Sequence, residues 1–407
     1  MARVDSANGT QNTRAPHALK IALVLDKYTP SRGGESYFSG LAEGLTRRGH
    51  EVHIFGAVVE REGSTLYQVH RIPVIPFPRF LRMLSYLVTS KWALSSCEFD
   101  IIHGVGGVLY MNVFNPHGGV DRAYLKREAA SMHRKWYVIY RKARRYLSLH
   151  HHVSLWIQDR QYRSDRVKKY IAISEMIKRD ITRYYEVKDG RISVIFNGVD
   201  TDRFHPKNRD LYRVQKCNEL QIDEKTLVLL FVGNNYRLKG VRQLLRALVL
   251  LKEWFPTQPL RLLIAGRGRI RPYRRLAQAL GVGEDVLFLG PVLEIEKYYA
   301  VADIYVHPTF YDSCSLSVLE ALASGLPVVT TQFNGAAEAI LSEKGGRVIE
   351  DPADIKSLAG ALAGYFDSKK RKIARSAARE WAEQHTLTRN LDETIAVYEE
   401  VSRKSSS

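Results

Sequence analysis

The 407-residue sequence has few cysteines, a shortage of acidic residues and no long apolar run. Its three cysteines, Cys97, Cys217 and Cys314, are odd in number and far apart, which argues against a disulfide framework or a zinc ligand set. No run approaches the roughly 20 apolar residues that a membrane-spanning helix needs. The polar residues 1–18 lack the apolar core of a signal peptide and predict a disordered arm. We therefore expect a cytoplasmic protein.

The shortage of acid leaves 61 lysines and arginines against 43 aspartates and glutamates, a formal net charge of +18. Such a charge favours an anionic partner, which could be nucleic acid, an anionic membrane face or a phosphorylated substrate. Basic residues are concentrated in residues 121–169, which contain no glycine or proline and are interleaved with tryptophan and tyrosine. This pattern predicts a long basic helical insertion. It would contact an anionic membrane surface, or, alternatively, form a solvated helical hairpin whose aromatic residues pack on the core.

Short apolar runs alternate with segments of helical periodicity along the rest of the chain. In the first half the predicted strands are 20–26, 50–59, 71–75, 100–106, 167–174 and 192–200; in the second they are 227–233, 260–266, 285–292, 303–309 and 326–333. Alternation of strand and helix is typical of parallel α/β sheets, and the length requires two domains. The predicted organisation is an arm 1–18, a first domain 19–204 with the insertion at about 121–169, a second domain 205–380, and a C-terminal helix 381–407 that returns to the first domain and frays.

Two carboxylates eight positions apart mark the strongest motif, HPTFYDSCSLSVLEALASGLPVVTT at residues 307–331. Asp312 follows a predicted strand, and Glu320 falls in the first turns of a helix. The residues that begin this helix are Ser315, Leu316 and Ser317. Unpaired N–H groups at a helix start can hold a diphosphate, so Glu320 could reach ribose hydroxyls and Asp312 the hydroxyls of a sugar. The alternative is that both acids merely cap and flank a helix.

A second motif, FVGNNYRLKG, places two cations at a strand-to-helix junction. The strand ends at Gly233, and Arg237 and Lys239 follow on a loop, where they could neutralise a departing diphosphate. A third motif, TPSRGGESYF, follows the first strand, and its Gly33 and Gly34 would let the backbone approach a ligand closely. Solvated charges and a plain turn are the alternatives for these two motifs.

Taken together, these motifs resemble glycosyltransferase family 4, the retaining two-domain enzymes of the GT-B fold. The family pattern is Glu, seven residues and a second Glu; here Asp312 replaces the first Glu and is one methylene shorter. The family's usual arginine follows the strand glycine directly, where this chain has Asn234, so Arg237 is the substitute. The arginine close to Lys239 and the basic insertion are similar to lipopolysaccharide-core glucosyltransferases. The resemblance implies an α/β fold with two Rossmann-like parallel-sheet domains facing a cleft.

The resemblance also implies further donor contacts. Gly33, Gly34, Gly233 and Gly266 would lie against the donor, and the nucleotide base would bind backbone groups near Val292. His117, in NPHGGVD, would touch the donor sugar or the acceptor, although a lone histidine is as readily structural. Glu338 could close over the base or sugar.

The function implied is retaining transfer of a hexose from a nucleotide sugar, a UDP-sugar by default, to a lipid-linked or lipopolysaccharide-core saccharide. In the front-side route of this family the departing phosphate oxygen takes the acceptor proton, and no metal or other cofactor is expected. The enzyme would sit peripherally at the inner face of the cytoplasmic membrane. The alternatives are a basic nucleic-acid or membrane-binding scaffold with a degenerate site, or a GT-B epimerase or phosphorylase. The basic stretch carries no nucleic-acid motif, so no nucleic acid is expected as a partner.

Overall fold

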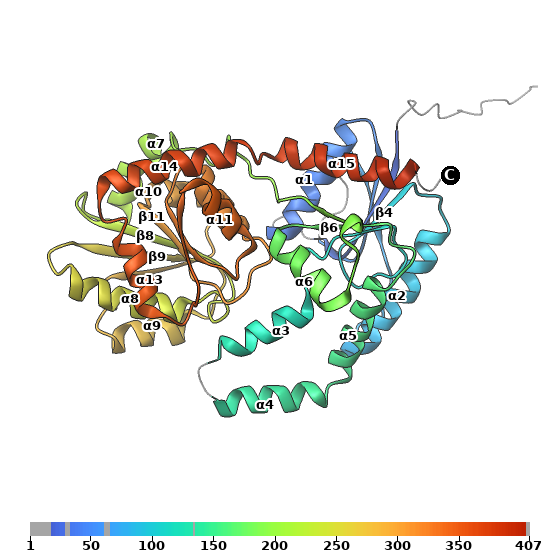
Figure 1. The fold of residues 1–407 in the computed structure, drawn as a ribbon, viewed down its shortest axis with the longest axis horizontal. Helices are drawn as coiled ribbons and strands as arrows, with labels where there is room; N and C mark the ends of the chain where they lie inside the picture. Colours follow the sequence, from blue (N-terminus) through green and yellow to red (C-terminus); the bar gives the residue numbers. More distant parts are fainter. Residues whose placement is uncertain (1–17, 29–32, 61–65, 133–134, 404–407) are drawn as a thin grey trace, which may run out of the picture.

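The computed structural model describes residues 18–28, 33–60, 66–132 and 135–403. Most of the predicted arm (1–17), the loop residues 29–32 before Gly33 and the last four residues of the predicted frayed tail lie outside the described residues. Two α/β units follow one another along the described chain, and helices α14 and α15 run across both of them (Figure 1).

The first unit is built on a parallel sheet of seven described strands in the order β3-β2-β1-β4-β5-β6-β7. These strands are β1 Lys20–Tyr28, β2 Glu51–Val59, β3 Gln68–Arg71, β4 Ile101–Gly104, β5 Val113–Phe114, β6 Lys169–Ala172 and β7 Ile192–Val194. Its helices are α1 Gly33–Arg47, α2 Arg79–Ser95, α3 Asp121–Ala130, α4 Lys135–Tyr146, α5 Leu149–Tyr162 and α6 Glu175–Tyr185, with a 3-10 turn at Asp189–Arg191. The central strand β1 is a nearly continuous apolar run because helices cover both faces of a parallel sheet.

The second unit repeats this architecture with six described parallel strands in the order β10-β9-β8-β11-β12-β13. The strands are β8 Leu227–Val232, β9 Leu260–Ala265, β10 Val286–Gly290, β11 Ile304–His307, β12 Val328–Thr331 and β13 Gly346–Ile349. The helices are α7 Asn208–Glu219, α8 Val241–Trp254, α9 Ile270–Ala279, α10 Ile295–Val301, α11 Leu316–Ala323, α12 Glu338–Glu343, α13 Ile355–Ala363 and α14 Ser368–Glu383, with a 3-10 turn at Gly335–Ala337. The last described helix, α15 Leu387–Arg403, returns to the first unit.

Both sheets reverse their strand order at one point, between β1 and β4 in the first and between β8 and β11 in the second. Ligands of open parallel sheets bind outside the carboxyl ends of the strands at such a switch point. The loop after β8 carries Lys239, and the loop after β11 carries Asp312. The topology thus brings the two strongest sequence motifs to one place.

One prediction about local structure needs correction. The predicted strand 71–75 is not formed: β3 ends at Arg71, and Pro73 has no N–H to donate to a ladder. The basic insertion is helical, as predicted, and consists of the three helices α3, α4 and α5. Helix α5 starts afresh because Ser148 caps it, with its Oγ accepting a bond from the His151 N–H at 3.4 Å.

The two units are packed against each other. One apolar cluster belongs to the first sheet and another to the second, while a third runs through both units. The last helix, α15, lies against α1 and β4 of the first unit, where the Tyr398 hydroxyl is 2.6 Å from Nδ1 of His103. No described helix combines the length and the apolar character needed to cross a bilayer.

Gly240 sets the path of the loop that carries Lys239. Its φ is +76°, and an added Cβ would lie 2.1 Å from the backbone oxygen of Pro308, in the loop after β11. The residue must therefore be glycine both for its left-handed conformation and for the close approach of two loops.

We predict that Gly240→Ala lowers the free energy of unfolding by well over the 1–2 kcal/mol or so that a left-handed alanine costs. Gly281 is the matched control, because its φ is +74° but no heavy atom lies within 4 Å of its added Cβ. Urea unfolding of both variants measures the difference. Equal losses of stability in the Gly240→Ala and Gly281→Ala variants would show that the close contact with Pro308 does not require glycine at position 240.

Candidate functional site

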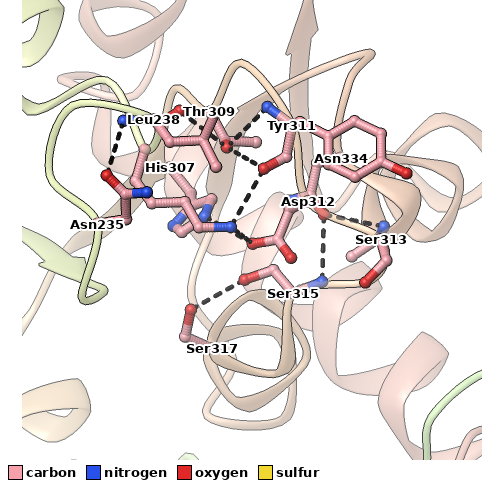
Figure 2. Close-up of polar contacts among 12 residues, drawn as sticks. Asn235, Leu238, His307, Thr309, Tyr311, Asp312, Ser313, Ser315, Ser317 and Asn334 are labelled. Carbon is pink, nitrogen blue, oxygen red and sulfur yellow. Dashed lines mark hydrogen bonds and ion pairs between the residues drawn. The ribbon is translucent and has the colours of Figure 1, made fainter. Parts of the chain in front are cut away.

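An ion pair between Lys239 and Asp312 lies at the centre of the candidate site (Figure 2). The Lys239 ammonium also donates to the backbone oxygen of Tyr311 at 3.2 Å, and Nε2 of His307 is 3.1 Å from Oδ2 of Asp312. Burial alone would raise the pKa of Asp312, but the ammonium and the histidine hydrogen bond hold it well below its usual range. Asp312 is therefore a fixed negative charge that can accept hydrogen bonds.

Helix α11 begins directly beside this pair. Its N-cap is Ser315, whose side chain makes no capping bond in the described structure and lies with its Oγ 3.0 Å from Oγ of Ser317. The Ser315 N–H is held instead by Oδ1 of buried Asn334, at 3.2 Å. Leu316 is the first helical residue. The positive end of the helix is therefore left for a bound anion.

Glu320 lies one turn further along α11 in a different environment. The Tyr299 hydroxyl donates to its Oε2 at 2.8 Å, and burial raises the pKa of Glu320 to about 7. Together with Arg203, Glu320 lines a cavity of about 490 Å³ between α1, α11 and α15. The pKa values of the two carboxylates in this motif are thus shifted in opposite directions: that of Asp312 is lowered and that of Glu320 is raised.

His117 is brought to the same site from the first unit. Its ring stacks on Tyr37 with the centroids 5.1 Å apart, and its backbone oxygen accepts a 2.8 Å bond from Ser313, next to Asp312. Burial lowers the pKa of His117 to about 4, so the imidazole is neutral near pH 7. Its buried Nδ1 has no hydrogen-bond partner among the described residues, which makes it a group that a ligand could satisfy.

Arg237 points away from the Lys239–Asp312 pair, toward the insertion. Its guanidinium donates to buried Glu128 of α3 at 2.7 Å, and Glu128 also pairs with Arg141 at 2.8 Å and with Arg145, both on α4. Of the two predicted cations, one is thus tied to Asp312 and the other to the first unit. Glu128 was not among the predicted residues, although it is one of only four acids in the basic stretch 121–169, which was a signal.

Two of the predicted glycines, Gly233 and Gly266, lie where two backbone segments come close together. A Cβ on Gly266, whose φ is +123°, would lie 2.0 Å from the backbone oxygen of Gly233, so the ends of β8 and β9 approach closely. Gly33 and Gly34 are the first residues of α1. Val292 lies half-buried in the loop between β10 and α10.

Two residues beside the site bond to the first unit: Tyr311, which the sequence did not single out, and Glu338, which was expected over the base or sugar. The Tyr311 hydroxyl accepts a 3.1 Å bond from the Val120 N–H, which joins the two units beside Asp312. Glu338 caps α6 of the first unit by accepting bonds from the Glu175 and Met176 N–H groups at 2.9 and 2.8 Å. Tyr311 lies inside the motif 307–331, but nothing in the sequence indicated that its partner would be Val120 of the first unit. Within the described residues, no group of three or more His, Cys, Asp or Glu side chains is placed to hold a metal ion.

Comparison with known families assigns each half of the chain to a model. Residues 31–203 match the model described as Glycosyltransferase Family 4, and residues 215–381 match the one described as Glycosyl transferases group 1. The lipopolysaccharide glucosyltransferase WaaG of Escherichia coli K12 is 25% identical over 367 residues, which cover 89% of this chain and 92% of WaaG. A D-inositol 3-phosphate glycosyltransferase 2 of Catenulispora acidiphila is 33% identical over 219 residues, 51% of this chain and 50% of that protein.

Solved structures share the fold. The crystal structure of WaaG superimposes with a TM-score of 0.78 at 23% identity, covering 93% of this chain and 99% of that one. Anabaena HepE in complex with UDP-glucose gives a TM-score of 0.68 at 16% identity, with coverage of 93% and 99%. The predicted fold of two parallel-sheet α/β domains, the GT-B fold, is therefore confirmed.

The raised pKa of Glu320 predicts a pH-dependent contribution to stability. A glutamate in the unfolded chain titrates near 4.3, whereas Glu320 in the folded chain titrates at about 7. The folded state binds this proton more tightly, so the contribution of Glu320 becomes less favourable as pH rises from about 4.3 through 7. Glu320→Gln lacks this titration and should gain stability relative to wild type across that window. Urea unfolding at pH 5 and pH 8 measures it.

The control for the change from glutamate to glutamine itself is exposed Glu380 on α14. A difference between wild type and Glu320→Gln that is the same at both pH values would contradict the prediction.

Proposed function

Because the chain belongs to the glycosyltransferases that join a family 4 domain to a group 1 domain, we propose that it is a retaining enzyme that transfers a hexose from a UDP-sugar. The observation that carries the proposal is the convergence of Lys239, Asp312 and the start of α11 at the switch point of the second sheet.

The donor diphosphate would lie between Lys239 and the first turn of α11. The ammonium and the N–H groups near Ser315, Leu316 and Ser317 provide positive charge where the leaving group develops negative charge. Groups that are already oriented need no rearrangement during the reaction, which makes this kind of stabilisation large. Gly233 and Gly266, which lie at the carboxyl ends of β8 and β9, would lie against the diphosphate. Arg237 would add positive charge to this site after its guanidinium leaves Glu128 and bonds to the diphosphate.

The other parts of the donor would be divided between the two carboxylates. Glu320 would accept hydrogen bonds from the ribose, in the cavity between α1 and α11, with the base near Val292. Asp312, ionised and held by Lys239, would accept bonds from hydroxyls of the sugar. The neutral His117 would bond the same sugar or the acceptor through its unsatisfied Nδ1. Gly33 and Gly34, at the start of α1, would face the donor from the first unit.

The chemical step would replace one bond at the anomeric carbon by another on the same face. The acceptor oxygen forms a bond to that carbon as its bond to the diphosphate breaks, and the acceptor proton passes to the departing phosphate oxygen. A separate general base is unnecessary in this route. We propose that Lys239 and Arg237 supply the positive charge, without a metal ion, so turnover should persist in a chelator.

The acceptor we propose is a lipid-linked or lipopolysaccharide-core saccharide. It is supported by the similarity over most of both chains to WaaG, which is named a lipopolysaccharide glucosyltransferase. UDP as the nucleotide is supported by the structural neighbour HepE, which was solved with UDP-glucose.

We further propose peripheral binding of the insertion to the inner face of the cytoplasmic membrane. Exposed apolar side chains follow one another along α4, the turn after it and the first residue of α5, among many arginines: Trp136, Ile139, Tyr140, Tyr146, Leu147 and Leu149. Aromatic residues favour the headgroup zone, and each arginine or lysine near an anionic surface adds about 1 kcal/mol.

A thermal-shift panel of nucleotide sugars tests the donor assignment. A UDP-sugar at 100-fold over its Kd should stabilise the fold by about 2.7 kcal/mol, whereas other nucleotides should do less. Lys239→Ala should abolish most of that shift and lower kcat by about 10²–10³-fold, because it removes a charge from the leaving group. Exposed Lys225→Ala is the control and should change neither. Stabilisation by no nucleotide sugar would overturn the proposal.

Vesicle flotation tests the membrane assignment. Wild type should float with vesicles rich in phosphatidylglycerol and remain behind with phosphatidylcholine alone. Trp136→Ala with Ile139→Ala should weaken partition at least about tenfold, since each buried apolar side chain contributes about 1.5–3 kcal/mol. The matched control is Leu211→Ala with Val214→Ala, two equally exposed apolar residues on α7. Equal effects of the two double variants would argue against a membrane-binding face on α4.

A further inference from the structure

A basic cavity of about 720 Å³ lies between the insertion and the second unit. Ser131 and helix α4 form one wall, and the loops after β8 and β9 with the starts of α8 and α9 form the other. Its arginines are Arg141, Arg237, Arg242, Arg267 and Arg269. The described residues that line it include no aspartate or glutamate, and neither Lys239, Asp312 nor Glu320. The cavity is therefore adjacent to the proposed donor site and shares Arg237 with it.

The charges at one end of this cavity are not balanced by protein groups. Arg141 and Arg237, which line it, share the carboxylate of Glu128 with Arg145. Burial raises the pKa of Glu128, but the three guanidiniums lower it more, so the group is ionised. One negative charge against three positive charges leaves this cluster with two positive charges to spare. The three guanidinium side chains are half-buried, at 24%, 22% and 30% exposure, and like charges gathered in such a setting are costly unless an anion pairs with them.

Two polar atoms in the lining also lack partners. The buried Nε of Arg141 and the buried Oε1 of Gln243 make no hydrogen bond in the described structure. One is a donor and the other an acceptor, and unsatisfied buried groups of this kind are uncommon in folded proteins. Three tyrosines complete the lining, Tyr137 from the first unit with Tyr236 and Tyr273 from the second. The last two meet edge to face at 5.5 Å.

We propose that this cavity binds a phosphorylated saccharide as the acceptor, an inference that rests on the proposed glycosyl transfer. A phosphate monoester carries nearly two negative charges at pH 7, which would pair with the arginines of the cavity that the donor does not use, Arg141, Arg267 and Arg269. Its oxygens match the forked donors of arginine. The volume suits a small ligand, and tyrosine faces with the Gln243 amide suit a sugar ring and its hydroxyls.

The position of the cavity fits an acceptor. Arg237 lines the cavity and is separated by one residue from Lys239, so a saccharide bound there lies beside the proposed diphosphate. The wall from α4 and Ser131 belongs to the insertion, which gives this segment a role in choosing the substrate. A phosphate held by arginines at one end would fix which hydroxyl of the saccharide faces the donor sugar.

Calorimetric titration of the full chain with glucose 6-phosphate, in the absence of any nucleotide sugar, tests the proposal. Glucose 6-phosphate should bind at least about tenfold more tightly than glucose and than inorganic phosphate. Arg267→Ala with Arg269→Ala should weaken that binding at least about tenfold, and the double lysine replacement should recover part of it. Both arginines are exposed, so folding should be retained, which urea unfolding verifies.

The matched control is Arg274→Ala with Arg275→Ala, which removes the same charge from exposed positions on α9 outside the cavity. If both double variants weakened the binding of glucose 6-phosphate equally, the loss would follow from net charge alone, and the proposal would be overturned. Inorganic phosphate that binds as tightly as glucose 6-phosphate would overturn the saccharide part. Displacement of glucose 6-phosphate by UDP-glucose would place the phosphate in the donor site, against an acceptor role, whereas simultaneous binding supports it. The titration needs no nucleotide sugar. Its result can therefore be interpreted even if no nucleotide sugar stabilises the protein.

Discussion

The ion pair of Lys239 and Asp312 is the contact on which the candidate site depends. Both side chains are largely buried, at 17% and 16% exposure, so each needs the other to offset the cost of leaving water. The pair joins the loop after β8 to the loop after β11, the two strands that flank the point where the strand order reverses. Gly240 permits the same two loops to touch through their backbones. An ion pair and a close backbone contact therefore hold together the same two loops, those after β8 and β11.

The motif around this junction contains two carboxylates in contrasting surroundings. Asp312 faces an ammonium and an imidazole, whereas Glu320 is buried and accepts a hydrogen bond from a tyrosine hydroxyl. Opposite shifts of pKa in neighbouring acids are a common way of giving them different tasks. Here the contrast suits one group that remains a permanent charge and another that binds hydroxyls while exchanging a proton near neutral pH.

The sequence predicted the fold more completely than the site. Buried parallel strands such as β8 are continuous apolar runs, which is why most of them could be located in advance. The two-residue strand β5 is too short to produce a pattern, and the apolar run at 71–75 misled because Pro73 interrupts it. The residue types of the site were recognisable from motifs, and their roles stay predictions. Their partners were not recognisable, because Arg237 and Glu128 are 109 positions apart and only folding determines which way each side chain points.

The chain passes between the two units twice, and the two passages lie together. Val199 in the first passage bridges Thr386 in the second, and Gly198 packs so closely on Leu387 that a Cβ would lie 2.6 Å from its Cα. Asn390 further ties α15 to the backbone oxygen of Phe196. Because the two crossings are bonded to each other, any movement of one unit relative to the other would have to bend the chain at both crossings together. The segment between α14 and α15, although late in the sequence, therefore constrains the same junction as residues 198–199.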